Sequence, residues 1–313
     1  MTAGFSRRPA ILVTGADLAP AAVALLGGFD LVYAGKAPDE AALIALCEVH
    51  QPTAIIVRYG KVSAQIMDAS KKLRVISKHG AGIDTIDSVA AAARGIVVRA
   101  ATGANAAAVA EHTWALILAC AKKVVYLDTR MHDGHWDKAT HKSLELRGKT
   151  IGLVGLGAIG KRTAETGLAF GMHVVAYDPF ATAAPPGVTM CTLDELYAQS
   201  DVVSLHCPLT EENRKMIGRD AIARMRDGAI VVNTARGGLV DQQALLDAVK
   251  SGKLRAAGLD SFDTEPFVHA DQFNGVPDII LSPHIGGVTS DAYVSMGTAA
   301  AANILAVLAK EVH

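Results

Sequence analysis

Three glycines in the pattern Gly155-x-Gly157-x-x-Gly160 limit the possible folds of this chain more than any other feature. The short apolar run before them, residues 150–154, predicts a strand buried on both faces, and residues 161–170 after them predict a helix. In a parallel α/β fold the first glycine permits a tight turn, the second lets the backbone approach a pyrophosphate, and the third lets helix and strand pack closely. The free N–H groups that begin the helix can then bind phosphate.

A second strand supports the interpretation of this turn as a dinucleotide site. Residues 173–177 are apolar and end in Asp178, which lies 18 residues after Gly160 (178 − 160). An acidic residue about 20 residues beyond the last glycine accepts hydrogen bonds from an adenosine ribose. Its charge would repel a 2′-phosphate, and Tyr177 and Pro179 supply no cation, so the sequence predicts NAD rather than NADP. A tight turn without a cofactor is the alternative.

Composition excludes some classes of partner and predicts the redox compartment. The 313 residues suffice for two domains of ordinary size. A net charge of −1 argues against a nucleic-acid partner, which requires a basic field. The four cysteines are scattered and form no CxxC pair, which predicts buried free thiols in a reducing compartment: Cys47, Cys120, Cys191 and Cys207.

The apolar runs of the chain are short. No uninterrupted apolar run reaches the 18 residues that would predict a membrane span. The run at residues 10–13 follows two arginines, but it is too short for the apolar region of a signal peptide and predicts the first strand. We therefore expect a cytoplasmic protein without a membrane partner.

Strands and helices alternate along the chain, which is the pattern of parallel sheets covered by helices on both faces. The first hundred residues predict strands at 10–14, 31–34, 54–58, 74–78 and 97–99, and helices at 39–50, 63–69 and 86–93. The second half predicts strands at 201–206, 229–233, 256–260 and 279–281, and a helix at 242–251. An alanine-rich helix at 290–312 should return to the first domain, where its apolar face finds a partner.

A long apolar helix is predicted at residues 105–131. It is too apolar to lie alone on the surface, so we expect it to pack between domains or against a second subunit. The segment His132-Asp-Gly-His-Trp136 that follows resembles a metal-binding pair, but no third ligand is near. We therefore expect a loop there and no metal site.

Polar residues in the first domain follow two predicted strands. Arg58 and Tyr59 end one strand, and His79-Gly80-Ala81-Gly82 follows the next. Ligands collect at the carboxyl ends of strands in a doubly wound sheet, and the N–H groups of a glycine-rich turn can hold a carboxylate. An ordinary turn that needs positive φ, with a surface arginine, fits the spacing equally well.

Three polar residues of the second half also follow strand ends: Arg236, Glu265 and His284. Hydride transfer between a nicotinamide and a carbonyl needs a proton donor on the oxygen and a cation for an anionic substrate. An imidazole can exchange a proton near neutral pH, with a carboxylate fixing its tautomer, and a guanidinium can hold a carboxylate through its planar fork. On spacing alone, a surface ion pair and a capping histidine remain the alternative.

The motifs together resemble one family, the D-isomer-specific 2-hydroxyacid dehydrogenases. They run from His79-Gly-Ala-Gly-Ile-Asp84 through the glycine turn to Asp178-Pro179, His206-Cys-Pro-Leu-Thr210, Asn233-Thr-Ala-Arg-Gly237, Gly258-Leu-Asp260, Glu265-Pro266 and Ser282-Pro-His-Ile-Gly-Gly287. The resemblance implies an α/β chain of two doubly wound parallel-sheet domains. A Rossmann NAD-binding domain (102–284) would be inserted into a flavodoxin-like substrate domain (1–101 and 285–313). A homodimer would form through the NAD-binding domain.

The resemblance also implies roles for individual residues. Arg236 would bind the carboxylate and carbonyl oxygen of the substrate, His284 would be the general acid/base and Glu265 its partner, and Asp260 would contact the nicotinamide carboxamide. The cofactor would contact Gly155, Gly157, Ala158, Ile159, Gly160, Asp178, His206, Pro208, Thr234, Ala235, Asp260, His284 and Gly286. The substrate would contact Arg58, Tyr59, His79, Gly80, Ala81, Gly82, Arg236 and His284, with the backbone of Ala81 and Gly82 holding its carboxylate.

The reaction that the resemblance implies is reduction of a small anionic 2-oxo acid by NADH to the D-2-hydroxy acid, or the reverse. Within the family the chain is most similar to the phosphoglycerate dehydrogenase and hydroxypyruvate reductase branch. Phosphoglycerate enzymes commonly carry further basic residues where this chain has Tyr59-Gly60, and often arginine in place of His79. A phosphate would find fewer cations here, although Lys61, Lys78 and His79 could compensate, so we expect a smaller substrate such as hydroxypyruvate or glyoxylate.

Two other functions remain open. Formate dehydrogenase-like chains pair their histidine with glutamine, and Glu265 argues against that assignment. A non-catalytic NAD(H)-sensing protein, like the corepressors that share this fold, is the alternative from a different class. Because the printed sequence ends at His313, we also expect no regulatory small-molecule-binding domain after the tail.

Overall fold

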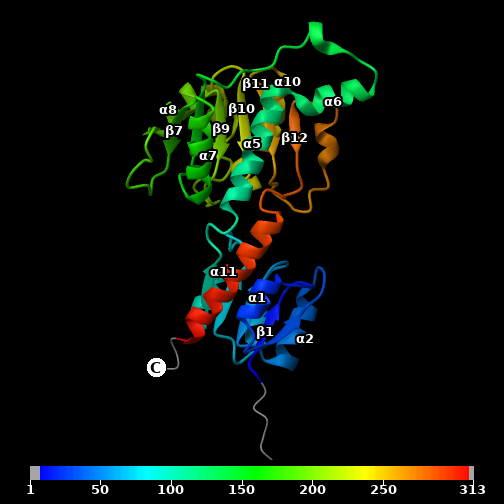
Figure 1. Ribbon diagram of the computed structural model, residues 1–313, viewed down its shortest axis with the longest axis vertical. Coiled ribbons are helices and arrows are strands. Elements are labelled where there is room, and N and C mark those ends of the chain that lie inside the picture. The colour runs from blue at the N-terminus through cyan, green and yellow to red at the C-terminus, as the bar shows by residue number, and fades with distance from the viewer. Residues whose placement is uncertain (1–7, 310–313) are drawn as a thin grey trace, which may run out of the picture. The chain divides into compact units, whose positions relative to one another are not determined.

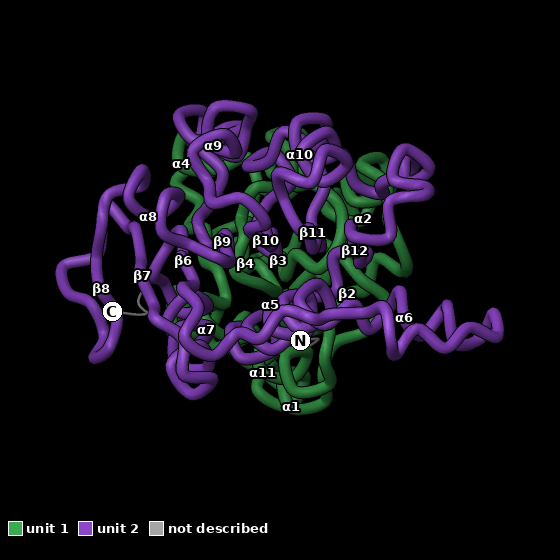
Figure 2. The backbone as a smooth tube through the Cα atoms, turned by 90° about the horizontal axis from the view of Figure 1, so that it is seen from above, with its two compact units in different colours: residues 1–105, 288–313 green, residues 106–287 purple. Residues whose placement is uncertain are grey.

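The computed structural model describes residues 8–309 and divides into two compact units (Figure 2). Unit 1 contains residues 1–105 and 288–313, and unit 2 contains residues 106–287. The division falls four residues after the predicted boundary at 101 (105 − 101) and three after the one at 284 (287 − 284). Residues 1–7, and the last part of the predicted tail helix, 310–312, lie outside the described residues.

Unit 1 is built on a five-stranded parallel sheet in the order β2-β1-β3-β4-β5. The strands are β1 (Ala10–Val13), β2 (Asp30–Tyr33), β3 (Ala54–Val57), β4 (Val75–Lys78) and β5 (Val97–Ala100). This is the 2-1-3-4-5 order of flavodoxin-like sheets, and it confirms the predicted fold class. Helices α1 (Pro20–Leu25) and α11 (Ser290–Ala309) pack on one face, and α2 (Glu40–His50), α3 (Ala64–Asp68) and α4 (Ser88–Ala93) on the other.

Successive residues of the central strands fill opposite cores of unit 1. Leu12 and Ile55 pack toward α2 and α3, whereas Ile11 and Ile56 pack toward α1 and α11. Side chains alternate between the faces of a strand, so a strand buried on both faces must be apolar throughout. All four residues of β3 are buried, as this rule requires.

Helix α11 has the apolar character that the sequence indicated. Within residues 8–309 it is the one helix long and apolar enough to cross a membrane, with a mean hydropathy of 1.6. Its Ala300, Ala301 and Ile304 are fully buried in the core of unit 1. A core helix of a folded domain passes the same test of length and composition, so the test alone is weak evidence for a membrane span.

Unit 2 is built on a seven-stranded parallel sheet in the order β12-β11-β10-β9-β6-β7-β8. Its strands are β6 (Thr150–Val154), β7 (His173–Tyr177), β8 (Val188–Met190), β9 (Val202–Leu205), β10 (Ala229–Asn233), β11 (Leu254–Leu259) and β12 (Ile279–Leu281). Counted from β6, this is the Rossmann order 3-2-1-4-5-6 with one strand added at the edge. The strand order reverses between β6 and β9, where such sheets bind their ligands.

Helices cover both faces of this sheet (Figure 1). Helices α5 (Ala106–Lys122) and α7 (Ala158–Ala169) lie on one face, and α8 (Leu193–Gln199), α9 (Arg219–Arg224) and α10 (Gln242–Lys250) on the other. Short 3₁₀ turns lie at Asp137–Ala139, Gly237–Leu239 and Ala270–Phe273. Helix α8 was not predicted, although Thr192 and Glu195 form a capping box that marks its start in the sequence.

The prediction of one continuous helix over 105–131 is wrong. Lys123 adopts a left-handed conformation, with φ of 54°, and separates α5 from α6 (Val124–His132). The Lys123 ammonium lies 2.8 Å from the Asp278 carboxylate, a contact made at this break. The apolar face of α5 packs on the sheet of unit 2 itself through Trp114 and Ile117, whereas α6 buries none of its residues.

Candidate active site

The glycine turn of unit 2 joins β6 to α7, as the sequence predicted. A Cβ at Gly155, which has φ of 99°, would lie 2.7 Å from the carbonyl carbon of His206, and one at Gly160 would lie 2.2 Å from the Gly155 oxygen. Neither position can therefore carry a side chain without moving backbone. Gly157 caps α7, and a Cβ there would meet nothing within 4 Å. Its open side leaves room for a phosphate at the helix N-terminus.

Two predicted cofactor contacts begin α7, and a third faces the turn. Ala158 and Ile159 form the first turn of this twelve-residue helix, where backbone N–H groups lack helical partners. Asp178 follows β7 and accepts hydrogen bonds from the Leu156 N–H (2.8 Å) and the Phe180 N–H (2.9 Å). Each carboxylate oxygen keeps a further lone pair, so the fixed side chain can still accept from a ribose hydroxyl.

His206 and Pro208 follow β9, on the other side of the point where the strand order reverses. The His206 Nε2 lies 3.0 Å from the Ser204 hydroxyl, while its buried Nδ1 has no hydrogen-bond partner within the described chain. Burial lowers the pKa of His206 to about 4, so the ring is neutral at pH 7. The Pro208 carbonyl accepts from the Asn213 amide at 2.8 Å.

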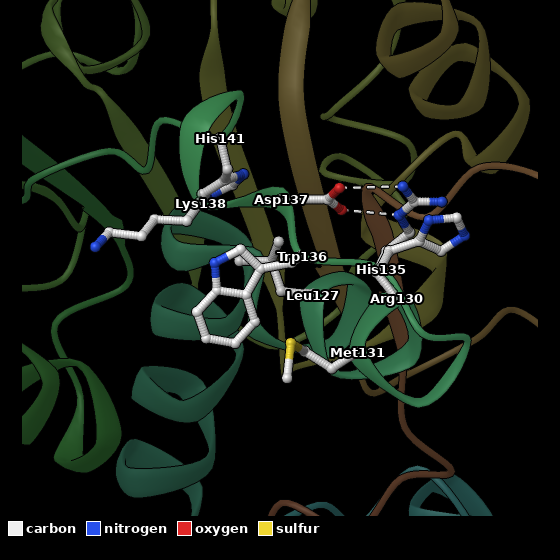
Figure 3. Close-up of a pocket in the computed structure, with 8 residues that line it drawn as sticks. All are labelled: Leu127, Arg130, Met131, His135, Trp136, Asp137, Lys138 and His141. Carbon is white, nitrogen blue, oxygen red and sulfur yellow. Dashed lines mark hydrogen bonds and ion pairs between the residues drawn. The ribbon is translucent and has the colours of Figure 1, made fainter.

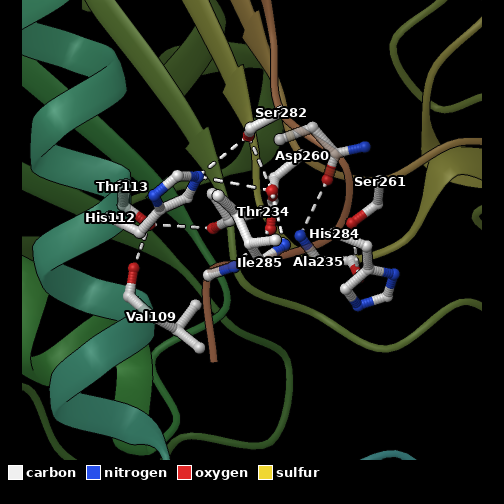
Figure 4. A network of polar contacts seen from close by, with 12 residues as sticks. Val109, His112, Thr113, Thr234, Ala235, Asp260, Ser261, Ser282, His284 and Ile285 are labelled. Carbon is white, nitrogen blue, oxygen red and sulfur yellow. Dashed lines mark hydrogen bonds and ion pairs between the residues drawn. The ribbon is translucent and has the colours of Figure 1, made fainter. Parts of the chain in front are cut away.

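The loop after β10 carries Thr234, Ala235 and Arg236 in one hydrogen-bonded turn. The Asn233 side chain accepts from the Ala235 N–H (3.0 Å) and donates to the Arg236 carbonyl (2.8 Å). The Arg236 guanidinium donates to the Ala235 carbonyl at 2.7 Å. The Thr234 hydroxyl lies 2.8 Å from that of Thr113 on α5, which ties the loop to the helix (Figure 4).

Close backbone packing joins this loop to the one after β11. A Cβ at Gly237 would lie 1.9 Å from the carbonyl carbon of Phe262, so only glycine fits. The Phe262 N–H in turn donates to the Glu265 carboxylate at 3.0 Å. Arg236 and Glu265 therefore lie on two loops in direct backbone contact, as expected for strand ends at one sheet edge.

Glu265 and His284 form the pair that the sequence predicted. The Glu265 Oε2 lies 2.7 Å from the His284 Nδ1, with both side chains partly exposed. His284 follows β12 in a left-handed conformation, with φ of 53°, which is uncommon for a residue with a side chain. Its Nε2 makes no hydrogen bond to any residue of the described range. A carboxylate on Nδ1 fixes the tautomer and leaves Nε2 to exchange a proton with a ligand.

Asp260 clamps the backbone that carries His284 (Figure 4). Its side chain is 1% exposed and accepts from the Ser282 hydroxyl (2.6 Å) and from the N–H groups of Ile285 (2.9 Å) and Gly286 (2.8 Å). These bonds hold the chain on both sides of His284, which accounts for its unusual conformation. The sequence assigned Asp260 and Gly286 to the cofactor and did not predict this role.

His112 on α5 completes the network and was missed by the sequence reasoning. Its Nε2 lies 2.9 Å from the Ser282 hydroxyl and 3.3 Å from the Asp260 carboxylate. Its position within α5 gives no sequence signal, because the strand-end rule does not apply to a residue inside a helix. Ser282 stands inside a quoted motif, but nothing in its spacing pointed to Asp260.

Arg58 of unit 1 contacts other residues of the same unit. It follows β3, and its guanidinium donates to the carbonyl of Asp17 (2.6 Å) and to the carboxylate of the same residue. It also lies 5.2 Å from the centre of the Tyr59 ring and 5.0 Å from that of Tyr293. Asp17 was not predicted as part of the site, although it follows β1 and satisfies the same strand-end rule.

His79 follows β4, and its ring is buried 5.5 Å from that of Tyr293. Burial, and then the positive charge of Arg58, lowers the pKa of His79 to about 4, so it adds no cation at neutral pH. Gly80 has φ of 149°, Ala81 lies in the same bend, and Gly82 has no regular secondary structure. No helix follows directly, since α4 begins only at Ser88.

A hollow of about 380 Å³ lies elsewhere in unit 2, beside α6 (Figure 3). The side chains of Leu127, Met131 and Trp136 line it, together with the ion pair of Arg130 and Asp137. Over residues 8–309 no three His, Cys, Asp or Glu side chains gather as a metal ion would require. The predicted absence of a metal remains a prediction.

Comparisons with known proteins agree with this geometry. The profile of the D-isomer specific 2-hydroxyacid dehydrogenase NAD binding domain matches residues 114–286. A hydroxypyruvate reductase of Thermotoga maritima is 44% identical over 241 residues, which cover 76% of this chain and 78% of that protein. The D-3-phosphoglycerate dehydrogenase of Mycobacterium tuberculosis is 39% identical over 307 residues, or 97% of this chain, but the match spans only 57% of the mycobacterial protein.

A solved structure extends the likeness to both units. The TT0316 protein of Thermus thermophilus is 36% identical, with a TM-score of 0.88 over 96% of this chain and 97% of that one. Unit 2 is thus the NAD-binding domain that the glycine turn predicted, and the chain belongs to the D-isomer specific 2-hydroxyacid dehydrogenase family.

Proposed function

We propose that this chain is an NAD-dependent oxidoreductase that interconverts a small anionic 2-oxo acid and the D-2-hydroxy acid. The observation that carries the proposal is the 2.7 Å contact between Glu265 and His284, at the same sheet edge as the glycine turn. Family membership and relatives named as a reductase and a dehydrogenase support it.

The residues of unit 2 fit the cofactor. Gly157 and the first turn of α7 would hold the pyrophosphate, because N–H groups at a helix N-terminus lack helical partners and a Cβ at Gly157 would meet nothing within 4 Å. Asp178 would accept from the ribose, and its charge favours NAD over NADP. His206, Pro208, Thr234, Ala235 and Gly286 complete the proposed contacts at neighbouring strand ends. Bound NADH supplies the hydride for the carbonyl carbon.

The proton is the part of the reaction that the protein itself supplies. Arg236 would hold the substrate carboxylate and polarise its carbonyl oxygen through the guanidinium fork. The Nε2 of His284 would donate a proton to that oxygen, and the Glu265 carboxylate would stabilise the imidazolium in the reverse direction. One hydride on carbon and one proton on oxygen give the hydroxyl group. On unit 1, the N–H groups of residues 80–82 would hold the carboxylate.

A panel of 2-oxo acids tests this function. The pure protein is mixed with NADH and, separately, with glyoxylate, pyruvate, hydroxypyruvate or the 3-phosphate ester of hydroxypyruvate, while nicotinamide absorbance is followed. We expect turnover of at least one acid, and the D-2-hydroxy acid as product. NADH binding without turnover of any acid would reject the enzyme and favour the NAD(H)-sensing alternative.

We also propose that the chain forms a homodimer through α6 and the loop after it, residues 124–139. This helix buries none of its residues, and Val124, Val125, Met131 and Trp136 beside or within it are at least half exposed. A second copy would cover this apolar surface and the adjoining hollow. Light scattering should give twice the monomer mass of 32.6 kDa, and Trp136→Glu should lower it. A monomeric wild type would reject the proposal.

A cytoplasmic location is proposed from the thiols. All four cysteines are free, and two of them, Cys47 and Cys120, are fully buried. Unpaired thiols fit a reducing compartment. Recovery of the protein from an oxidising compartment after cell fractionation would contradict this proposal.

A further inference from the structure

Three neighbouring strands of unit 1 end in a cluster of polar side chains. Strands β1, β3 and β4 are adjacent in the sheet, and Asp17, Arg58 and His79 follow their carboxyl ends. Tyr293 of α11 packs against all three: it donates to the Asp17 carboxylate (3.0 Å), and its ring lies beside Arg58 and His79. This cluster includes Arg58 and His79, which the family resemblance implies as substrate contacts.

The positive charge of Arg58 is already paired within the cluster. Its guanidinium donates to both the backbone and the carboxylate of Asp17. The hydrogen bonds from Arg58 and then Tyr293 hold the pKa of the Asp17 carboxyl below its usual value, so Asp17 is ionised at neutral pH. His79 is buried and neutral. Asp17, Arg58 and His79 together therefore carry no net charge.

The exposed member of the pair is the acid. The Asp17 side chain is 68% exposed, whereas that of Arg58 is 11% exposed. An anion that approaches the cluster from solvent therefore meets a carboxylate before it reaches the guanidinium. Like charges at such short range repel, and the repulsion grows with the charge of the incoming group.

We infer that Asp17 is a specificity-determining residue that directs this chain toward 2-oxo acids with an uncharged remainder, such as a hydroxymethyl group or hydrogen, and against phosphate esters. The inference rests on the proposed function, because it names the substrate class of the same site. The neighbouring lysines do not replace Arg58: Lys78 donates to the Arg58 carbonyl and the Thr85 hydroxyl at 3.4 Å, and Lys61 is exposed.

A different role for Asp17 gives the opposite expectation. If the carboxylate only oriented Arg58 so that the guanidinium could bind a phosphate, removal of the carboxylate would weaken turnover of the ester. If it cancels the charge of Arg58, removal frees a cation, and turnover of the ester rises. One substitution therefore separates the two roles.

The test compares Asp17→Asn with the wild type on hydroxypyruvate and on its 3-phosphate ester. Asparagine keeps the shape and an acceptor for Tyr293 but loses the charge. We expect the wild type to prefer hydroxypyruvate. In the variant, the ratio of kcat/KM for the ester to that for hydroxypyruvate should rise by about tenfold or more, equivalent to about 1.4 kcal/mol. Asp17→Ser, which lacks the charge and the amide, should raise the ratio in the same direction.

Asp68→Asn is the matched control, because Asp68 forms an Arg–Asp pair with Arg94 elsewhere on unit 1 (2.7 Å). This control should leave the ratio unchanged. A wild type that prefers the ester, or a ratio that stays constant or falls in both Asp17 variants, would overturn the inference while leaving the dehydrogenase intact. Absence of turnover with every acid would instead reject the proposed function.

Discussion

Both sheets place a carboxylate against a basic side chain at the carboxyl ends of their strands, but the two pairs leave different groups available. In unit 2, Glu265 contacts one nitrogen of His284, and the other makes no hydrogen bond over residues 8–309. In unit 1, Asp17 binds a guanidinium that is permanently charged and mostly buried. We propose that the first arrangement serves a proton donor, whereas the second pairs the charge of Arg58 with that of Asp17. The same position in the two sheets thus leaves a ring nitrogen available to a ligand in unit 2 and a carboxylate exposed in unit 1.

The two glycine-rich turns also differ between the units, in whether a helix follows the turn. Gly155 to Gly160 leads directly into a twelve-residue helix, so its N–H groups and the helix dipole act together on an anion. A short turn follows Gly82, and no helix begins before Ser88. The first turn therefore has the arrangement that binds a pyrophosphate, whereas the second has no helix dipole directly behind it.

The largest expected effect tests the proton donor proposed for unit 2. His284→Ala should lower kcat by about 10² to 10⁴, the usual contribution of a general acid/base. NADH affinity should change little, because the glycine turn and Asp178 are intact. Steady-state rates and fluorescence titration with NADH measure the two quantities. His173→Ala, at the exposed first residue of β7, serves as control. A near-wild-type rate for His284→Ala would assign the proton to another group.

The two arginines give a direct comparison between the units. Arg236→Lys should lower kcat/KM by about 10², because an ammonium cannot reproduce the planar fork at the reacting oxygen. Arg58→Lys should cost less than about tenfold, since its charge is already paired with Asp17 and the lysine can keep that pair. Parallel kinetics with hydroxypyruvate measure both. A larger loss at Arg58 than at Arg236 would reverse the comparison.

A smaller effect is expected at the end of β7. Asp178→Ser should raise the ratio of kcat/KM with NADPH to that with NADH by about tenfold, because one repulsive charge near the 2′-phosphate is removed. Asp194→Ser, at an exposed carboxylate of α8, is the matched control. If only the Asp194 variant changed cofactor preference, or neither did, the proposed ribose contact would be misplaced.

The smallest effect concerns acid stability through His79. Its folded pKa of about 4 lies below the ordinary 6.5, so between these values the unfolded chain binds a proton that the native chain does not. The contribution of the neutral His79 ring to the free energy of unfolding is fully present above pH 6.5. It falls as pH decreases from 6.5 toward 4, by at most about 1.4 kcal/mol per pH unit. His79→Gln should flatten this slope in urea unfolding between pH 7 and 5. An unchanged slope in His79→Gln would mean that the native ring is protonated.

Much of the fold and part of the site could be predicted because the signals are local in the chain. The glycine spacing, the apolar strand before it and Asp178 after β7 all lie within about thirty residues, and each has a direct structural cause. The break at Lys123 could not be predicted, because the apolar pattern continues through it and its ammonium contacts Asp278, far along the chain. Helix α8 had a readable signal in its capping box, which was overlooked.

By itself, the sequence determined two parallel α/β sheets, a dinucleotide turn and an Arg, a Glu and a His at strand ends, because periodicity and glycine conformation act between near neighbours. The tertiary structure alone decided which side chains these and other polar residues contact. It paired Arg58 with Asp17, 41 residues away, and buried Asp260 beneath His112 to hold the backbone of His284. Hydrogen bonds and burial between distant segments set the charge and orientation of a side chain, and no local pattern encodes them.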